Sequence, residues 1–221
     1  MTTVKHGIYP KAAKVELLPI ESSDPPIKPR MVILHVAGSK TPNGLFNWFL
    51  SLQDTTHVEA HFLVKKNGAI EQYRSIYVQA DANVAANDFA VSIETEGLGN
   101  GKWSKKQLAS LKNLILWLHR EAGIPLHLAR AWNGEGVGYH SQFTQWLITP
   151  KSCPGPKRIV QIHKVLRPWL IKQRETIEKA QKAKLVSKTK AEISTSVAKK
   201  APAKKTAAKK TAKKPPAKKS N

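Results

Sequence analysis

The sequence is short of the features that would place it in several protein classes. Its 221 residues contain one cysteine, Cys153, so no intramolecular disulfide can form, and a lone thiol fits synthesis in a reducing cytoplasm. No stretch approaches the roughly 18 consecutive apolar residues of a membrane-spanning helix. The first thirty residues lack the charged start and apolar run of an ordinary secretory signal. We therefore expect neither a transmembrane segment nor a signal peptide.

Acidic residues are also scarce, and their distribution divides the chain in two. Residues 1–170 hold 20 basic and 12 acidic residues, a net charge of +8, whereas residues 171–221 hold 17 and 3, a net charge of +14. No aromatic residue follows Trp169, so the second part cannot build a hydrophobic core. We expect an extended lead-in (1–29), one folded domain (30–170), and a helical extension followed from about residue 185 by a disordered Lys/Ala/Pro-rich tail (171–221).

The folded part alternates between strand and helix patterns. Asn67-Gly68 between two apolar runs predicts a β-hairpin, and Ser104 followed by Gln107 predicts a capped helix that ends at Gly123. Strands interspersed with helices predict an α/β fold, a mixed, mostly β-sheet flanked by helices. The predicted strands are 31–36, 61–65, 69–73 and 89–94; the predicted helices are 45–50, 104–123 and one that begins near Pro156 and that Pro168 should end or kink.

Three possible metal ligands lie at the ends of predicted elements. His35 follows the apolar run 31–34, His140 follows a glycine-rich loop at 133–138, and Cys153 lies in the motif Lys-Ser-Cys-Pro-Gly-Pro at 151–156. Two imidazoles and a thiolate, with a fourth position open for water, are typical of catalytic zinc. The alternative is structural: His35 would be a hydrogen-bonded histidine at the end of a strand, and Cys153 a small buried apolar residue.

The order of these residues resembles that of the zinc-dependent N-acetylmuramoyl-L-alanine amidases of type 2. That family includes phage amidase endolysins and peptidoglycan-recognition proteins. The resemblance covers roughly residues 30–170, and the segment 80–94 is most similar to endolysins of phages that infect actinobacteria. The residues that carry it are His35, Val58-Glu59-Ala60-His61-Phe62 with the Asn-Gly hairpin, Ser92-Ile93-Glu94, and His140 followed by Lys151-x-Cys153-Pro154-Gly155.

The resemblance implies that His35, His140 and Cys153 bind Zn²⁺, with Cys153 at a position where many relatives have aspartate. It also implies that Glu94 is the general base and that Lys151 stabilises the oxyanion on the attacked carbonyl. Each has a simpler interpretation, because Glu94 could be an ordinary carboxylate at a strand end and Lys151 a solvated loop lysine.

Glu96, two residues beyond Glu94, is a second candidate for the general base. For the substrate, the resemblance implies that His61 lines the cleft, and we expect Trp132 and Asn133 to wall it, although a core position for Trp132 is equally compatible with the sequence. The chain departs from some relatives at Ala60, where the phage branch often has tyrosine, and at residues 79–82, where many members have a histidine.

The function implied is peptidoglycan hydrolysis by zinc-activated water at the amide bond between N-acetylmuramic acid and L-alanine. We expect a monomeric phage endolysin, made in the host cytoplasm, that lyses the host cell by degrading its wall. A tail-associated lysin and a bacterial housekeeping amidase are alternatives within this class. Two other functional classes are possible. One is a non-catalytic peptidoglycan-recognition module, and the other is a protein that binds polyanions or nucleic acid through its basic tail.

The basic tail, residues 171–221, has three interpretations. It could bind anionic cell-wall polymers, bind nucleic acid without sequence specificity, or merely increase solubility. No aromatic residue follows Trp169, so no stacking surface supports sequence-specific recognition of nucleic acid. Of the three interpretations, we expect electrostatic binding to the anionic cell wall.

Overall fold

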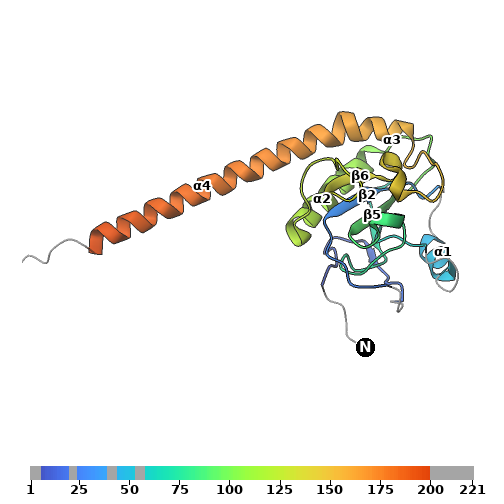
Figure 1. Cartoon of the computed structure of the whole chain (residues 1–221), viewed down its shortest axis with the longest axis horizontal. Helices are drawn as coiled ribbons and strands as arrows, with labels where there is room; N and C mark the ends of the chain where they lie inside the picture. The colour runs from blue at the N-terminus through green and yellow to red at the C-terminus, as the bar shows by residue number, and fades with distance from the viewer. Residues whose placement is uncertain (1–5, 20–23, 39–43, 53–57, 200–221) are drawn as a thin grey trace, which may run out of the picture. The chain divides into compact units, whose positions relative to one another are not determined.

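The computed structural model describes residues 6–19, 24–38, 44–52 and 58–199, with side chains described as far as residue 189. The chain forms two units, Met1–Ile177 and Glu178–Asn221. Within the described residues of the first unit, six strands form one mixed sheet in the order β1-β4-β3-β5-β2-β6 (Figure 1). The strands are β1 (Lys14–Val15), β2 (Met31–Leu34), β3 (Phe62–Val64), β4 (Ile70–Gln72), β5 (Ala90–Thr95) and β6 (Gly136–Tyr139).

Helices flank this sheet, which confirms the predicted α/β class. The α-helices are α1 (Leu45–Leu52), α2 (Lys105–Ala122), α3 (Pro156–Gln161) and α4 (Arg167–Lys199). Short 3₁₀ helices cover Val84–Ala86, His140–Gln142 and Thr144–Trp146, and a π-helical turn covers Ile162–Leu166. None of the described helices is both long enough and apolar enough to cross a membrane.

The direction of the central strands decides where the functional side chains meet. β2 pairs in parallel with both β5 and β6, and the register places Leu34 opposite Ile93 on one side and Tyr139 on the other. The next residue along each strand is therefore His35, Glu94 and His140. Because the carboxyl ends of parallel strands lie at the same edge of a sheet, these three residues are brought together there.

Strand β2 is buried on both faces. Val32 and Leu34 pack into the large core with α2, whereas Met31 and Ile33 pack into a second cluster with Phe89. This alternation follows from the two-residue repeat of a strand, and an apolar run buried on both sides is typical of a central parallel strand. The double packing fixes the position from which His35 extends.

Strand β6 was not predicted, because its residues were interpreted as a glycine-rich loop. The reason for its glycines is close packing. A Cβ atom at Gly136, where φ is 102°, would lie 2.5 Å from the carbonyl oxygen of His127, and one at Gly138 would lie 2.7 Å from the Trp146 ring. Glycine has low strand propensity, so the sequence pattern favours a loop although the tertiary packing requires these glycines in a strand.

The N-terminal lead-in, predicted as residues 1–29, contributes to the fold. Its residues 14 and 15 form β1, which pairs in parallel with β4. Tyr9 and Leu18 are buried, and the Tyr9 N–H donates to Gln72 Oε1 at 2.7 Å. Residues 1–5 and 20–23 of the lead-in lie outside the described residues. The described part of the lead-in therefore packs against the sheet.

The helix predictions are confirmed for α2 and need a correction for α1. Helix α2 begins with the predicted capping box of Ser104 and Gln107 and ends at Gly123 in the left-handed conformation. The density of apolar residues at 45–50 predicts a short buried helix, but in α1 Trp48 is 52% exposed while Phe49 is buried. α1 is therefore amphipathic and presents one apolar face outside the core.

The C-terminal helix bears on two predictions, the effect of Pro168 and the start of the disordered tail at about residue 185. Pro168 does not end it: the π-helical turn before Arg167 widens the backbone where a proline ring would otherwise meet the carbonyl four residues earlier. The helix also continues beyond residue 185, to Lys199. Residues 200–221, the rest of the predicted disordered tail, lie outside the described residues.

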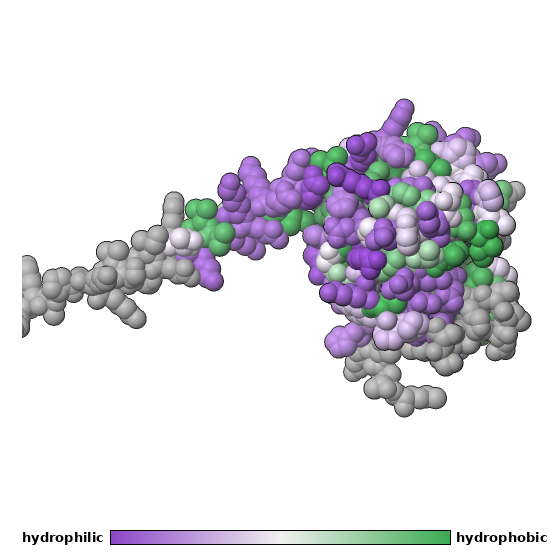
Figure 2. Space-filling model, in the orientation of Figure 1, coloured by the Kyte–Doolittle hydropathy of each residue, from purple (hydrophilic) through white to green (hydrophobic). Residues whose placement is uncertain are grey.

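In the second unit, every side chain of the described stretch 178–189 is exposed. Figure 2 shows the coloured part of α4 as mostly hydrophilic with a few hydrophobic patches. Leu185 and Val186 are exposed hydrophobic residues of this helix. This stretch gains no stability from a buried face.

Candidate active site

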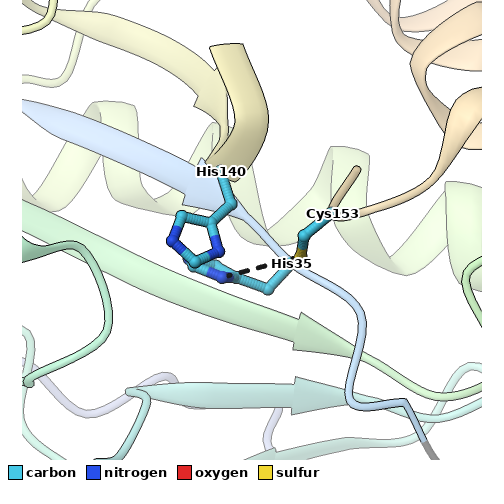
Figure 3. A group of neighbouring side chains, drawn as sticks. All are labelled: His35, His140 and Cys153. Atoms are coloured by element: carbon cyan, nitrogen blue, oxygen red, sulfur yellow. Dashed lines mark hydrogen bonds between the residues drawn. The ribbon is translucent and has the colours of Figure 1, made fainter. Parts of the chain in front are cut away.

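Two histidines and the single cysteine converge at the carboxyl edge of the sheet. His35 follows β2, His140 follows β6, and Cys153 lies in the loop before α3 (Figure 3). One potential ligand atom from each residue lies within 4.8 Å of the other two. His35 Nδ1 is 3.9 Å from Cys153 Sγ, and the two imidazole rings are 4.4 Å apart between centroids. The structure thus groups the three residues predicted to bind metal.

The remaining polar atoms of this cluster contact nearby loops. His140 Nε2 lies 2.8 Å from the carbonyl oxygen of Trp146, and His35 Nε2 lies 2.8 Å from Asn83 Oδ1. The Val36 N–H donates to Cys153 Sγ at 3.3 Å. A carbonyl oxygen only accepts hydrogen bonds, so His140 carries its proton on Nε2 and leaves the Nδ1 lone pair available to a metal.

Burial shifts the pKa of every titratable group in the cluster toward its neutral form. It raises the pKa of Cys153 to about 12, with the Glu94 carboxylate adding to the rise, and raises the pKa of Glu94 to about 8, partly opposed by Arg158. Burial and the neighbouring His140 hold the pKa of His35 well below its usual value, and burial lowers that of His140. A buried divalent cation would compensate the thiolate and the carboxylate.

The donor set fits zinc. Ligands about 2.0–2.3 Å from one ion lie roughly 3.3–3.8 Å from each other in a tetrahedral site, close to the 3.9 Å between His35 and Cys153. Among the described residues, the buried Glu94 Oε2 has no hydrogen-bond partner. His35, His140 and Cys153 can therefore hold the ion and leave one position open beside Glu94.

The sequence offers two candidates for the general base, Glu94 and Glu96, and the two side chains have different surroundings in the structure. Glu94 lies in β5 with Oε1 4.0 Å from His35 Nδ1, in the wall of the groove. The lowered pKa of His35 keeps that imidazole neutral, so the contact is not an ion pair. Glu96 Oε2 instead accepts a hydrogen bond from the Lys66 N–H at 2.7 Å, which holds it against the hairpin. Only Glu94 faces the cluster.

The cluster opens into a groove of about 920 Å³. Its walls include Lys151 and the apolar residues Trp48 and Ile148, and Ile148 is 83% exposed. Lys151 is close enough for its charge to lower the pKa of both His35 and His140. The groove therefore combines a cation beside the cluster with an apolar rim that a ligand could cover.

His61 does not line this groove, contrary to the prediction. Its side chain is fully buried, its Nδ1 accepts the Ser92 N–H at 3.0 Å, and its Nε2 donates to the carbonyl oxygen of Val78 at 2.9 Å. Burial lowers the pKa of His61 to about 3. Both nitrogens are thus used by the backbone, and His61 joins β5 to the segment that follows β4.

Trp132 and Asn133 are also not among the residues that line the groove. Trp132 packs against the cluster around Met31, and its carbonyl oxygen accepts the Trp146 ring N–H at 2.9 Å. Asn133 is exposed, and its carbonyl oxygen accepts a hydrogen bond from Arg30 at 3.4 Å. Trp132 is therefore half-buried against the core cluster around Met31, which is closer to the alternative interpretation than to a position in the wall of the groove.

The structure adds Arg158 on α3, a residue that sequence reasoning missed. Arg158 is 1% exposed, and its guanidinium donates to the carbonyl oxygens of Leu98, Pro154 and Glu96 at 2.8, 3.1 and 3.3 Å. It therefore ties the loop that carries Cys153 to the end of β5. Its position four residues before the buried Ile162, on the same helical face, is a signal that could have identified it.

Comparison with known proteins identifies a family whose model matches this chain and several solved structures with a similar fold. The family model for N-acetylmuramoyl-L-alanine amidase matches residues 25–156. Among solved structures, a selenomethionine derivative of AmpD superposes with a TM-score of 0.53 at 18% identity, covering 73% of this chain and 97% of that one. Drosophila peptidoglycan recognition protein SD gives 0.52 at 20% identity, covering 67% and 88%, and bumblebee PGRP-SA gives 0.54 at 16%, covering 69% and 89%. At these identities the likeness shows a shared fold. A comparison with curated protein sequences finds no match.

Proposed function

The chain belongs to the N-acetylmuramoyl-L-alanine amidase family, whose model matches more than half of its residues, and from this premise we propose that it is a zinc-dependent peptidoglycan hydrolase. Its substrate bond is the amide between N-acetylmuramic acid and the L-alanine of the stem peptide. The observation that carries the proposal is the convergence of His35, His140 and Cys153 beside Glu94 in an open groove.

The residues divide the work of amide hydrolysis among them. His35, His140 and Cys153 would hold a zinc ion, which would supply a Lewis acid that lowers the pKa of bound water to about 7 and polarises a carbonyl. Glu94 accepts a proton from the attacking water and delivers it to the nitrogen of the leaving L-alanine. The carbon–nitrogen bond then breaks, which leaves a carboxylate on the lactyl group and a free amino terminus on the peptide.

A non-catalytic recognition module is the second candidate, because several members of the structural comparison are peptidoglycan recognition proteins. A module that only binds needs no general base, whereas Glu94 is held at the cluster despite the cost of burying a carboxylate. Digestion of purified peptidoglycan tests the two. We expect release of soluble fragments, its loss with a chelator and its recovery with added zinc. Binding without release under all three conditions would favour the recognition module.

Lys151 is expected to stabilise the negative charge that develops on the attacked carbonyl oxygen. We predict that Lys151→Ala lowers kcat by about 10²–10³-fold, the usual effect of removing such a donor, while zinc content is unchanged. Lys157→Ala is the matched control, since Lys157 is also exposed but does not line the groove. Equal activity of both variants would assign Lys151 to the solvated surface.

The biological setting proposed is a phage endolysin, which acts on the wall after release from the host cytoplasm. The support is the similarity of segment 80–94 to endolysins of actinobacteriophages. Expression in an actinobacterial host should leave cells intact until the membrane is permeabilised. Lysis without permeabilisation would favour a tail-associated or secreted amidase.

The basic segment 171–221 is proposed to hold the enzyme on anionic wall polymers. Its net charge of +14 favours any polyanion through release of counterions, and a second attachment raises the effective concentration at an immobilised substrate. The absence of aromatic residues beyond Trp169 leaves no surface for stacking on bases, which disfavours sequence-specific recognition of nucleic acid.

We predict that removing residues 186–221 weakens binding of the enzyme to the cell wall and leaves the rate of amide hydrolysis unchanged. The deletion removes a net charge of +11, from 12 basic and one acidic residue, and its described side chains are exposed. Turnover of soluble muropeptides should be unchanged, while binding to intact walls weakens and its salt dependence flattens. A full-length variant with the ten lysines after residue 193 replaced by glutamine should behave likewise. Identical salt curves for all three proteins would remove the proposal, and competition by DNA but not by wall polymer would transfer it to nucleic acid.

A further inference from the structure

Asn83 is a fully buried polar side chain that contacts the candidate site from a loop. Its Oδ1 lies 2.8 Å from His35 Nε2, and its Nδ2 donates to Ser92 Oγ at 2.6 Å. The first contact reaches the His35 nitrogen on the far side of the ring from Cys153. The second joins Asn83 to β5, the strand that carries Glu94. Both polar groups of the Asn83 amide are therefore engaged.

The loop around Asn83 is fixed by the side chain of Asn87. Asn87 Oδ1 accepts the N–H groups of Asn83 and Ala82 at 2.6 and 3.2 Å, and Asn87 Nδ2 donates to Asp81 Oδ1 at 2.9 Å. Val84, the next residue, has φ of 47°, a conformation that is rare for a β-branched side chain. The hydrogen bonds from Asn87, two of which are made to the backbone of this loop, therefore hold Asn83 in the position from which its side chain contacts His35.

The direction of the Asn83 amide selects the tautomer of His35. With Oδ1 toward the ring, His35 Nε2 must carry the proton, and the Nδ1 lone pair points toward Cys153 and Glu94. With the amide reversed, the proton would move to Nδ1 and block it. His140 is fixed in the matching state by the Trp146 carbonyl oxygen. Only the His35 state depends on a side chain that can be replaced.

We propose that Asn83 is a positioning residue that presets His35, in the metal-free protein, as an Nδ1 ligand. It acts by fixing both the ring orientation and the tautomer, so that little reorganisation is needed when the ion binds. The proposal rests on the zinc site of the proposed function, but the state that it describes exists before zinc is present. That difference allows the two to be tested separately.

The direct test is the ¹⁵N NMR signature of His35 in the zinc-free full-length protein. We expect Nε2 to carry the proton and Nδ1 to be unprotonated in the wild type, and a mixture of tautomers in Asn83→Leu. Protonated Nδ1 in the wild type would overturn the proposal whatever the variants do. This measurement remains decisive if Asn83→Leu does not fold.

Zinc affinity, measured by competition with a chromophoric chelator, is the second readout. Asn83→Leu should bind zinc about 10–100-fold more weakly, whereas Asn83→Asp, which keeps an acceptor at the same place, should retain wild-type affinity or exceed it. Gln72→Leu is the matched control, because it removes an equally buried amide that lies in β4 and makes no contact with the cluster. Wild-type affinity in a folded Asn83→Leu protein, or equal losses in the Leu and Asp variants, would contradict the proposal. Failure of the wild type to bind zinc would instead contradict the proposed function.

Discussion

His140→Ala is expected to remove the metal and abolish hydrolysis. The substitution deletes one of the three predicted ligands, and the remaining pair, His35 and Cys153, cannot complete a site that needs three protein ligands. We expect zinc content to fall from about one ion per chain to background, and peptidoglycan hydrolysis to fall with it. Elemental analysis of the purified protein, alongside release of soluble wall fragments, measures both.

The control for His140→Ala is His163→Ala, which removes an exposed histidine from the π-helical turn outside the cluster. That variant should keep zinc and activity. Cys153→Asp is informative as well, because the resemblance places aspartate at this position in many relatives; it should retain zinc. A His140→Ala protein with full zinc content and wild-type activity would show that the three residues do not form the functional site.

Glu94→Gln is expected to keep zinc and lose turnover by about 10²–10⁴-fold, the usual contribution of a positioned general base. Glutamine has nearly the same shape but cannot accept the proton of the attacking water. Glu94 is buried and its Oε2 has no hydrogen-bond partner among the described residues, so the neutral amide should fit without loss of stability. We expect the Tm to be unchanged or raised, which separates a chemical defect from unfolding.

Glu96→Gln is the matched control, since Glu96 contacts the Lys66 N–H at the hairpin and does not line the groove. Single-turnover kinetics on a soluble muropeptide should give wild-type rates for Glu96→Gln and the large loss for Glu94→Gln. The reverse pattern would move the general base to Glu96 and overturn the role assigned here to Glu94.

The parts of the fold that follow from local patterns could be predicted from the sequence. The hairpin at Asn67-Gly68, the capping box at Ser104 and the apolar strand β2 each have signals within a few neighbouring residues. β6 could not be predicted, because its glycines are required by contacts with His127 and Trp146, residues outside the strand itself. Tertiary packing there overrides local propensity.

The three residues that converge in the candidate site could be predicted from the sequence, whereas the residues around them could not. His35, His140 and Cys153 were identified by residue type and by the sequence motif around the cysteine. The parallel pairing of β2 with β5 and β6 explains why the two histidines lie close together. His61 was misplaced because residue order does not reveal that both of its nitrogens bond to the backbone. Asn83 carries no sequence signal, since its role depends on a loop fixed by contacts with Asn87.

The central claim is that the protein cleaves the amide bond between N-acetylmuramic acid and L-alanine, and the chemistry of the new chain ends tests it most directly. Purified peptidoglycan should be digested to completion, and the products assayed for new amino termini and for new reducing sugar ends. The account predicts new L-alanine amino termini that appear with time, with no increase in reducing ends and none of either when zinc is removed. Reducing ends without L-alanine amino termini, or amino termini of any other residue, would contradict it.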